Sequence, residues 1–273
     1  MTADLHCHTT ASDGTLAPAQ LVRLAKDLGL KALGITDHDT VNGIEEAVDA
    51  GERLGIEIIP GLELNTDFEG VEVHILGYYP DLEAPALQEV LARMRDARRS
   101  RVRAMLEKLN GLGLAVREER VLEIAGQGSV GRPHVAQALR EQGYVKDIMD
   151  AFARYIGPGR PAYVSRYKLT PEQGVGLIGA AGGIAVLAHP GSVARDEIIP
   201  RLLQTGLKGI EVFHTSHSKD MERKYSEMAR TLGLVMTGGS DFHGPGRKDG
   251  IQVGDRTVPL TVVQELKQLK EQM

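Results

Sequence analysis

The 273-residue chain is long enough for one large α/β domain or for a barrel with an insertion, and its hydrophobic content of 42% allows a sizeable core. The single cysteine, Cys7, excludes an internal disulfide and suits a reducing cytoplasm. No apolar run approaches the ~18 residues of a membrane helix and no signal-peptide pattern is evident, so we expect a cytoplasmic protein without a membrane partner. The modest net charge of −5 excludes no class of partner by itself.

In chain order, short apolar runs alternate with helical patterns. The expected strands cover residues 3–6, 31–36, 56–64, 71–77, 183–188, 209–213 and 234–237. A turn at Glu69 and Gly70 is expected to join the third and fourth strands as a hairpin. The expected helices cover residues 18–28, 43–54, 171–181, 196–204, 219–232 and 260–271. Repeated strand–helix units favour a largely parallel sheet, and about seven strands indicate a barrel.

The segment between Asp81 and Lys168 interrupts this alternation. Its pattern is mostly helical, and it holds 16 basic and 11 acidic residues, whereas the rest of the chain holds 16 basic and 26 acidic residues. We therefore expect a metal-binding β/α barrel over 1–80 and 169–273, with residues 81–168 inserted as a small helical subdomain that acts as a substrate lid. The arginines between positions 93 and 103 fall on several helix faces, which favours a solvated surface for most of them.

Histidines and carboxylates gather within the expected strands or where these strands end. His6 and His8 share one face of the first strand, while Cys7 points away and is expected to be buried. Comparable positions are held by His38, Glu63, His74, His189, Asp241 and His243. The carboxyl ends of barrel strands form one ring, where active sites lie. Together with Asp13, these side chains supply about nine ligands, which suits two or three metal ions better than one.

The order of these motifs resembles that of the PHP (polymerase and histidinol phosphatase) superfamily, whose members are metal-dependent phosphoesterases. The motifs are His-x-His at 6–8, Asp-Gly at 13–14, Thr-Asp-His-Asp at 36–39, Gly-x-Glu at 61–63, Val-His-Ile-Leu-Gly-Tyr at 73–78, Ala-His-Pro-Gly at 188–191 and Gly-Ser-Asp-Phe-His at 239–243. The resemblance covers nearly the whole barrel. It implies an α/β fold of the distorted (β/α)7 TIM-like kind, with the helical subdomain as an insertion.

The resemblance also implies three groups of metal ligands. They are His6, His8, Glu63 and Asp241 for one ion, Glu63 as a bridge with His74 and His189 for a second, and Asp13, His38 and His243 for a third. Since the family allows histidine or aspartate at position 13, the aspartate favours manganese, magnesium or iron over zinc. Two or three divalent ions are expected, with manganese as the first choice and iron, zinc and magnesium as alternatives.

A closer resemblance is to the bacterial nucleoside 3′,5′-bisphosphate phosphatases, which remove the 3′-phosphate from adenosine 3′,5′-bisphosphate and in some members trim short RNAs from the 5′ end. It rests on Gly-Arg-Pro-His-Val-Ala at 131–136, Gly-Arg-Pro-Ala-Tyr-Val at 159–164 and Thr-Ser-His-Ser at 215–218. Where a family match has Arg-Thr-His-Phe-Ala, this chain has Arg-Pro-His-Val-Ala. The resemblance implies that Arg132 and His134 contact the second phosphate of the substrate and that Arg160, Ser216 and His217 are further contacts.

The residues around Arg132 admit two interpretations. Pro133 favours the first turn of a helix, whose exposed N–H groups attract anions, so an arginine and a histidine there suit a phosphate clamp. An ordinary helix N-terminus is the alternative. His217 has a similar choice between a substrate contact and the general acid of the reaction, whereas His214 is expected to be structural. Asp37 and Asp39 flank a ligand and are expected to orient an imidazole.

The ligand pattern favours in-line attack by a hydroxide that bridges two metals, with no covalent intermediate. Glu63 and Asp241 are catalytic through the ions they hold, and either His217 or a metal-bound water protonates the leaving oxygen. The expected substrates are nucleoside bisphosphates and short RNA 5′ ends. Stable binding of duplex nucleic acid is not expected, because the pI is ≈ 6.0 and no aromatic-basic platform is evident.

Three alternatives remain open from the sequence. A cyclic sugar phosphodiester is a possible substrate within the superfamily. Histidinol phosphate fits less well, because the basic insertion suits a second phosphate. A non-catalytic metal-binding or nucleic-acid-binding module predicts missing ligands, whereas every position of the motif set is filled here.

Overall fold

The computed structural model describes residues 2–126, 130–165, 167–246 and 250–273. The chain forms two compact units, of which unit 1 comprises Met1–Glu89 with Lys168–Met273 and unit 2 comprises Val90–Tyr167. The assignment of a metal-binding barrel to 1–80 and 169–273 and of a substrate lid to 81–168 stays a prediction.

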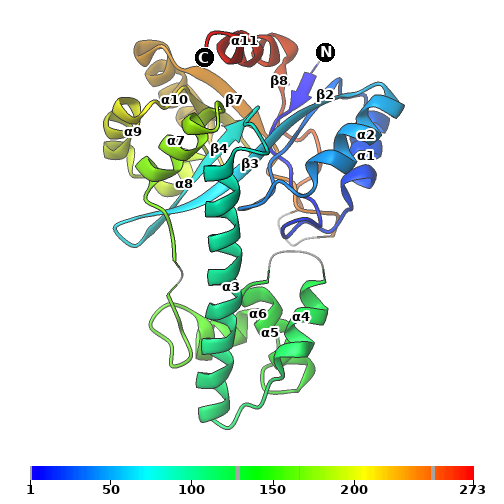
Figure 1. Ribbon diagram of the computed structural model, residues 1–273, viewed down its shortest axis with the longest axis vertical. Coiled ribbons are helices and arrows are strands. Elements are labelled where there is room, and N and C mark those ends of the chain that lie inside the picture. Colours follow the sequence, from blue (N-terminus) through cyan, green and yellow to red (C-terminus); the bar gives the residue numbers. More distant parts are fainter. Residues whose placement is uncertain (1, 127–129, 166, 247–249) are drawn as a thin grey trace. The chain divides into compact units, whose positions relative to one another are not determined.

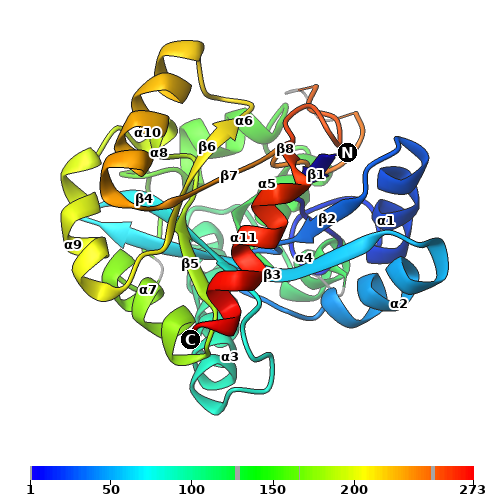
Figure 2. The same cartoon turned by 90° about the horizontal axis from the view of Figure 1, so that it is seen from above.

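Unit 1 is built on one sheet, whose eight strands within the described residues follow the order β7-β6-β5-β4-β3-β2-β1-β8. The strands are β1 Thr2–Asp4, β2 Ala32–Ile35, β3 Glu57–Phe68, β4 Val71–Tyr78, β5 Ile184–Leu187, β6 Gly209–His214, β7 Val235–Gly239 and β8 Val258–Pro259. Leu5 N donates to Gly238 O at 3.2 Å, and Asp241 N donates to His6 O at 2.8 Å. These bonds join the segments around β1 and β7, so the sheet nearly closes into a barrel (Figure 2).

The predicted barrel class is confirmed, but the sheet is less parallel than expected. The pairs β1–β2, β2–β3, β5–β6 and β6–β7 are parallel, whereas β4 runs antiparallel to both β3 and β5. The cause is the predicted hairpin: Glu69 and Gly70 have φ angles of 52° and 85°, as a two-residue turn of this hand requires. The short β8, which pairs antiparallel with β1, was not predicted.

Helices cover the sheet of unit 1. They are α1 Pro18–Asp27, α2 Ile44–Leu54, α7 Pro171–Ala180, α8 Pro190–Val193, α9 Ile199–Thr205, α10 Lys219–Leu232 and α11 Leu260–Glu271. Thr170 caps α7 by accepting from Gln173 N, and Gly233, with a φ of 66°, follows the last residue of α10. The predicted helix at 196–204 begins as a 3-10 turn, Asp196–Ile198, before α9 starts with a proline in its first turn. The short α8 was not predicted.

The last helix, α11, closes one end of the barrel, as Figures 1 and 2 show from two directions. Its buried Val262, Val263 and Leu266 pack in one cluster with Ala3 at the start of β1 and Ile184 at the start of β5. The amino ends of the strands are therefore filled by aliphatic side chains. The opposite, carboxyl ends are left to polar residues.

Unit 2 is helical, and the described part of 90–167 contains no strand. Its helices are α3 Pro85–Gly111, which begins in unit 1, followed by α4 Glu118–Ala125, α5 Arg132–Glu141, α6 Ile148–Ala151 and a π-helical turn at Phe152–Ile156. The unit has its own core, formed by buried residues such as Met105, Leu109, Val121, Leu139 and Ile156. No helix among the residues described here is long and apolar enough to span a bilayer.

The closing role of α11 can be tested with Leu266→Ala. Leu266 is fully buried, so the truncation should lower the free energy of unfolding by about 2–5 kcal/mol. Leu28, which is 55% exposed, gives the control, and Leu28→Ala should change stability little. Urea denaturation of both variants measures the difference, and equal stabilities would show that α11 does not pack as described.

Candidate metal centre

Four side chains meet at one point inside unit 1. His6 and His8 follow β1, Glu63 lies on β3 and Asp241 follows β7. The Nε2 atoms of His6 and His8 are 3.1 Å apart. Asp241 Oδ1 lies 3.3 Å and 3.0 Å from these two atoms, and Glu63 Oε2 lies 3.2 Å and 3.3 Å from them. The four donor atoms surround one point in the way that ligands surround a metal ion.

The carboxylate of Glu63 faces a second group of imidazoles through its other oxygen. Oε1 lies 2.8 Å from His74 Nδ1 and 3.0 Å from His189 Nε2. Oε2 also lies 3.0 Å from His38 Nδ1. Because the two oxygens face different imidazoles, this fully buried carboxylate has the geometry of a ligand shared by two ions.

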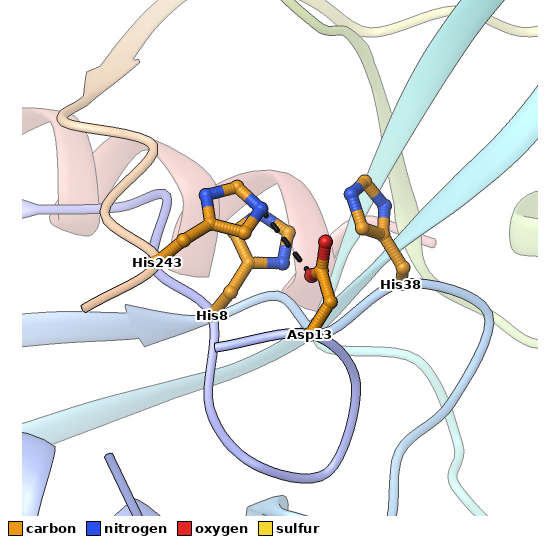
Figure 3. A group of neighbouring side chains, drawn as sticks. All are labelled: His8, Asp13, His38 and His243. Atoms are coloured by element: carbon orange, nitrogen blue, oxygen red, sulfur yellow. Dashed lines mark ion pairs between the residues drawn. The ribbon is translucent and has the colours of Figure 1, made fainter. Parts of the chain in front are cut away.

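A third group combines His8, Asp13, His38 and His243. Figure 3 shows the four side chains converging from different segments of the chain, with Asp13 reaching up from the loop after β1. His243 Nε2 lies 3.3 Å from Asp13 Oδ1, and the rings of His8 and His243 stack with centroids 4.0 Å apart. The nine predicted ligands therefore come together in one place, and His8 lies in two of the groups.

The donor atoms fit divalent ions better than they fit one another as hydrogen-bond partners. Among the described residues, Glu63 Oε2 and Asp241 Oδ1 are buried atoms without a hydrogen bond. Burying a carboxylate oxygen in this way costs free energy unless a cation compensates it. Adjacent ligands of an octahedral ion with bonds of about 2.1 Å lie about 3.0 Å apart. The separations of 3.0 Å and 3.3 Å between Asp241 Oδ1 and the nitrogens of His8 and His6 are close to this value.

The charges of the cluster keep its carboxylates ionised. Burial alone would raise the pKa of Glu63, but the imidazoles of His38 and His74 hold it well below its usual range. Burial also opposes the charged form of His74, yet Glu63 and Glu72 raise the pKa of that imidazole to about 10. The centre therefore attracts cations, and a divalent ion that binds there displaces protons from the imidazoles.

Backbone strain concentrates at this centre. Asp39, His189 and Asp241 have positive φ angles of 53°, 24° and 59°, which are uncommon for residues other than glycine. Glu211 on β6 supports one of them, because its Oε2 accepts from His189 N at 2.9 Å. Its Oε1 lies 3.0 Å from His6 Nδ1, so one buried carboxylate holds parts of two ligand groups.

Glu211 and His214 lie beside the predicted ligands; sequence reasoning assigned no role to Glu211 and a structural role to His214. His214 Nε2 lies 3.5 Å from Asp241 Oδ2, while its Nδ1 accepts from Ser216 N at 3.1 Å. Together with His6 and Glu211, His214 forms a further group of donor atoms that could hold a metal ion. For Glu211 a signal was available, because a carboxylate within an otherwise apolar strand is rarely buried without a partner.

Asp37 positions a loop instead of an imidazole, contrary to expectation. Its Oδ1 accepts from Thr9 N at 2.7 Å and from Ser12 Oγ at 2.6 Å, and its Oδ2 accepts from Thr9 Oγ1 at 2.7 Å. These bonds fix the loop that carries Asp13.

Asp39 reaches an imidazole indirectly. Its two oxygens accept from Asn65 N at 2.9 Å and from Asn65 Nδ2 at 3.1 Å. The amide nitrogen Nδ2 in turn lies 3.1 Å from His38 Nδ1. Asp39 therefore acts on His38 through Asn65.

The backbone holds both ring nitrogens of His217. Nδ1 donates to Val212 O at 2.8 Å, and Nε2 accepts from Gly191 N at 3.0 Å. The side chain is buried, and burial lowers its pKa. Ser216 Oγ lies 2.8 Å from Ser192 Oγ, so Ser216 and His217 connect the loop after β6 to the short helix α8 that follows His189.

The remaining predicted substrate contacts lie in unit 2. Arg132 begins α5, and its guanidinium lies 5.3 Å from the ring centroid of Phe152. His134 Nδ1 accepts from Gly131 N at 3.0 Å, which leaves the proton of the neutral ring on Nε2. Arg160 has an exposed side chain in the turn after the π-helical segment.

The chain is similar to known proteins over most of its length. The PHP domain model matches residues 4–160. The 3′,5′-nucleoside bisphosphate phosphatase of Chromobacterium violaceum is 37% identical over 257 residues, which span 92% of this chain and 90% of that protein. A 5′-3′ exoribonuclease of Haemophilus influenzae is 36% identical, with 89% and 90% covered. A phosphoribosyl 1,2-cyclic phosphate 1,2-diphosphodiesterase of Eggerthella lenta is 34% identical, with 89% and 95% covered.

A solved structure from Bifidobacterium adolescentis, assigned as a metal-dependent phosphoesterase, superposes with a TM-score of 0.87 at 32% identity and covers 98% of this chain and 96% of that one. The barrel, the buried histidine–carboxylate cluster and these relatives define a metal-dependent hydrolase of phosphoric esters. The chain belongs to the PHP family.

The shared position of Glu63 predicts that its loss affects more than one ion. Glu63→Ala should abolish activity and lower the metal content by more than one equivalent, because both carboxylate oxygens disappear. Elemental analysis after dialysis against manganese measures the content. Glu227→Ala, an exposed change on α10, is the control. Full metal content in Glu63→Ala would contradict the bridge.

Proposed function

We propose that this enzyme removes the 3′-phosphate from nucleoside 3′,5′-bisphosphates, such as adenosine 3′,5′-bisphosphate, to give a nucleoside 5′-phosphate and inorganic phosphate. One observation carries the hydrolytic part of the proposal, namely that the two oxygens of the buried Glu63 face separate groups of imidazoles. The choice of substrate is supported by the near full-length similarity to a 3′,5′-nucleoside bisphosphate phosphatase. The expected compartment is the cytoplasm, which suits the free and buried thiol of Cys7.

The proposed cofactors are two or three divalent ions, with manganese first and iron, zinc and magnesium as alternatives. The ligands would be the three predicted groups, with Glu63 as the bridge and His8 next to both the first and the third group. Asp13 gives the third group a carboxylate, which favours a harder ion than zinc. When bound, the ions supply an activated water for attack on phosphorus and neutralise the phosphoryl oxygens.

The residues around the ligands prepare this centre. Glu211 orients His6, Asp39 orients His38 through Asn65, and Asp37 fixes the loop of Asp13. Such supports hold each ligand in one orientation, so that little reorganisation is needed when charge develops on the phosphoryl group.

The sequence left open whether His217 is the general acid of the reaction. We assign it a different role. A donor to the leaving oxygen needs an available N–H, but Nδ1–H already donates to Val212 O and Nε2 already accepts from Gly191 N. His217 and Ser216 are therefore proposed to support the loop of His189, whose φ of 24° is strained. The proton for the leaving oxygen would come from water at the centre.

Unit 2 is proposed to recognise the second phosphate. At the N-terminus of α5, the first N–H groups and the helix dipole favour binding of an anion. Arg132 adds a fixed positive charge, and His134 and Arg160 are further candidate contacts. A 5′-phosphate on a short single-stranded RNA offers the same group, so trimming of short RNA from the 5′ end is a second candidate activity. It is supported by the similarity to a 5′-3′ exoribonuclease.

A cyclic sugar phosphodiester is the main alternative substrate, since a relative named as a cyclic phosphate diphosphodiesterase is 34% identical. A panel assayed with manganese distinguishes the candidates: adenosine 3′,5′-bisphosphate, a short 5′-phosphorylated RNA, a cyclic ribose phosphate and histidinol phosphate. The highest kcat/KM should be found for the bisphosphate. A preference of ten-fold or more for the cyclic or histidinol substrate would refute the proposal.

The phosphate clamp gives a separate prediction. Arg132→Ala should lower kcat/KM for the bisphosphate by 10-fold or more, because a charge-assisted contact contributes about 1.5–3 kcal/mol. Hydrolysis of an aryl phosphate, which has no second phosphate, should change little. Arg140→Ala, at the other end of α5, is the matched control. Equal losses on both substrates would remove the assigned role.

A further inference from the structure

A chain of polar contacts leads outward from the metal centre to the place where the polypeptide returns from unit 2. Glu63 Oε1 lies 2.8 Å from His74 Nδ1, and His74 Nε2 lies 3.2 Å from Glu72 Oε1. Lys168 Nζ then donates to Glu72 Oε2 at 3.0 Å and to Asp67 Oδ2 at 3.3 Å. Lys168 is the first residue of unit 1 after unit 2.

The sheet places these groups side by side. Glu72 and His74 are two residues apart on β4, so their side chains share one face. In the hairpin, Glu72 pairs with Asp67 of β3, which explains how one ammonium reaches both carboxylates. The position of Lys168 is set by the backbone, because Asp67 N donates to Leu169 O at 2.8 Å.

Each ring nitrogen of His74 faces a carboxylate oxygen, and Nδ1 is the one on the side of the shared Glu63. An ion held between His74 Nδ1 and Glu63 would leave the proton of the neutral ring on Nε2, where the ionised carboxylate of Glu72 can accept it. The lone pair of the neutral ring is then on Nδ1, which faces Glu63 and the ion that the two would share. A carboxylate behind a ligating histidine also makes the imidazole a better donor.

We propose that Glu72 is a positioning residue for the metal ligand His74, and that Lys168 holds Glu72 in place. The inference deepens the proposed function, since it rests on His74 as a ligand of the ion that Glu63 shares. It also connects the return of the chain from unit 2 to the orientation of one metal ligand.

A purely structural ion pair would behave differently. The side chains of Glu72 and Lys168 are 45% and 16% exposed, and partly exposed pairs contribute little to folding. Glu57 on β3 makes a comparable pair with Lys267, and its side chain is 39% exposed. Glu57 begins β3, at the end of the barrel away from the ligands, so Glu57→Ala is a matched control.

The test is manganese binding by calorimetric titration of the full chain, together with thermal unfolding of the same samples without added metal. Glu72→Ala should weaken one class of manganese sites by about 10–100-fold and leave the remaining sites and the melting temperature nearly unchanged. Glu72→Gln should recover part of the affinity, because its amide oxygen still accepts from His74 Nε2. Lys168→Met should give a smaller loss than Glu72→Ala, and Glu57→Ala should bind as the unmodified protein does.

Two results would overturn the proposal. One is equal manganese affinity in Glu72→Ala and Glu57→Ala. The other is a loss of all sites together with a lower melting temperature, which would mean that Glu72 only supports the fold. The readout is binding, so it is independent of the substrate panel: failure to hydrolyse bisphosphates would refute the proposed function and leave the measured effect of Glu72 on metal affinity unaffected.

Discussion

The structure of the centre depends on one buried charge, the carboxylate of Glu63. No part of its side chain is exposed, and a buried carboxylate destabilises a fold unless positive charge compensates it. Here the compensation comes from imidazoles on β4 and just after other strands, and their spacing of about 3 Å around the carboxylate suits divalent ions. Metal binding and the stability of the barrel are therefore linked, because ions that bind the folded state alone stabilise it.

Holding so many polar groups together requires local strain, and neighbouring carboxylates offset it. His189 adopts a φ of 24° directly after β5, and its N–H donates to Glu211. Asp241, with a φ of 59°, has its N–H bonded to His6 O, which ties the end of β7 to the end of β1. Strain at these predicted ligands is tolerated because the nearly closed sheet fixes the strands that precede them. The barrel therefore fixes the ends of its strands, and with them the positions of the predicted ligands.

The sequence predicted which histidines and carboxylates gather at one place, because their positions follow from two simple rules. Short apolar runs locate the strands, and parallel strands bring their carboxyl ends to one edge, so His6, His38 and His189 had to meet. The residues that hold the predicted ligands in place were harder to predict, because their contacts depend on which side of a loop each side chain faces. Asp37 bonds to Thr9 and not to an imidazole, which only the fold decides. The antiparallel β4 and the short β8 likewise depend on long-range pairing that propensity does not encode.

The division into two units bears on how relatives with one fold differ in substrate. The relatives named as acting on bisphosphates, RNA and a cyclic phosphate are 37%, 36% and 34% identical to this chain, so overall similarity hardly separates them. Their reactions all attack a phosphorus atom, and the histidine–carboxylate cluster of unit 1 suits each of them equally. Discrimination must then come from groups that contact the rest of the substrate. We propose the N-terminus of α5, where Arg132 lies beside the ring of Phe152, as a source of these contacts. Its effect should appear in the ratio of kcat/KM between substrates with and without a second phosphate, and not in the rate with simple esters.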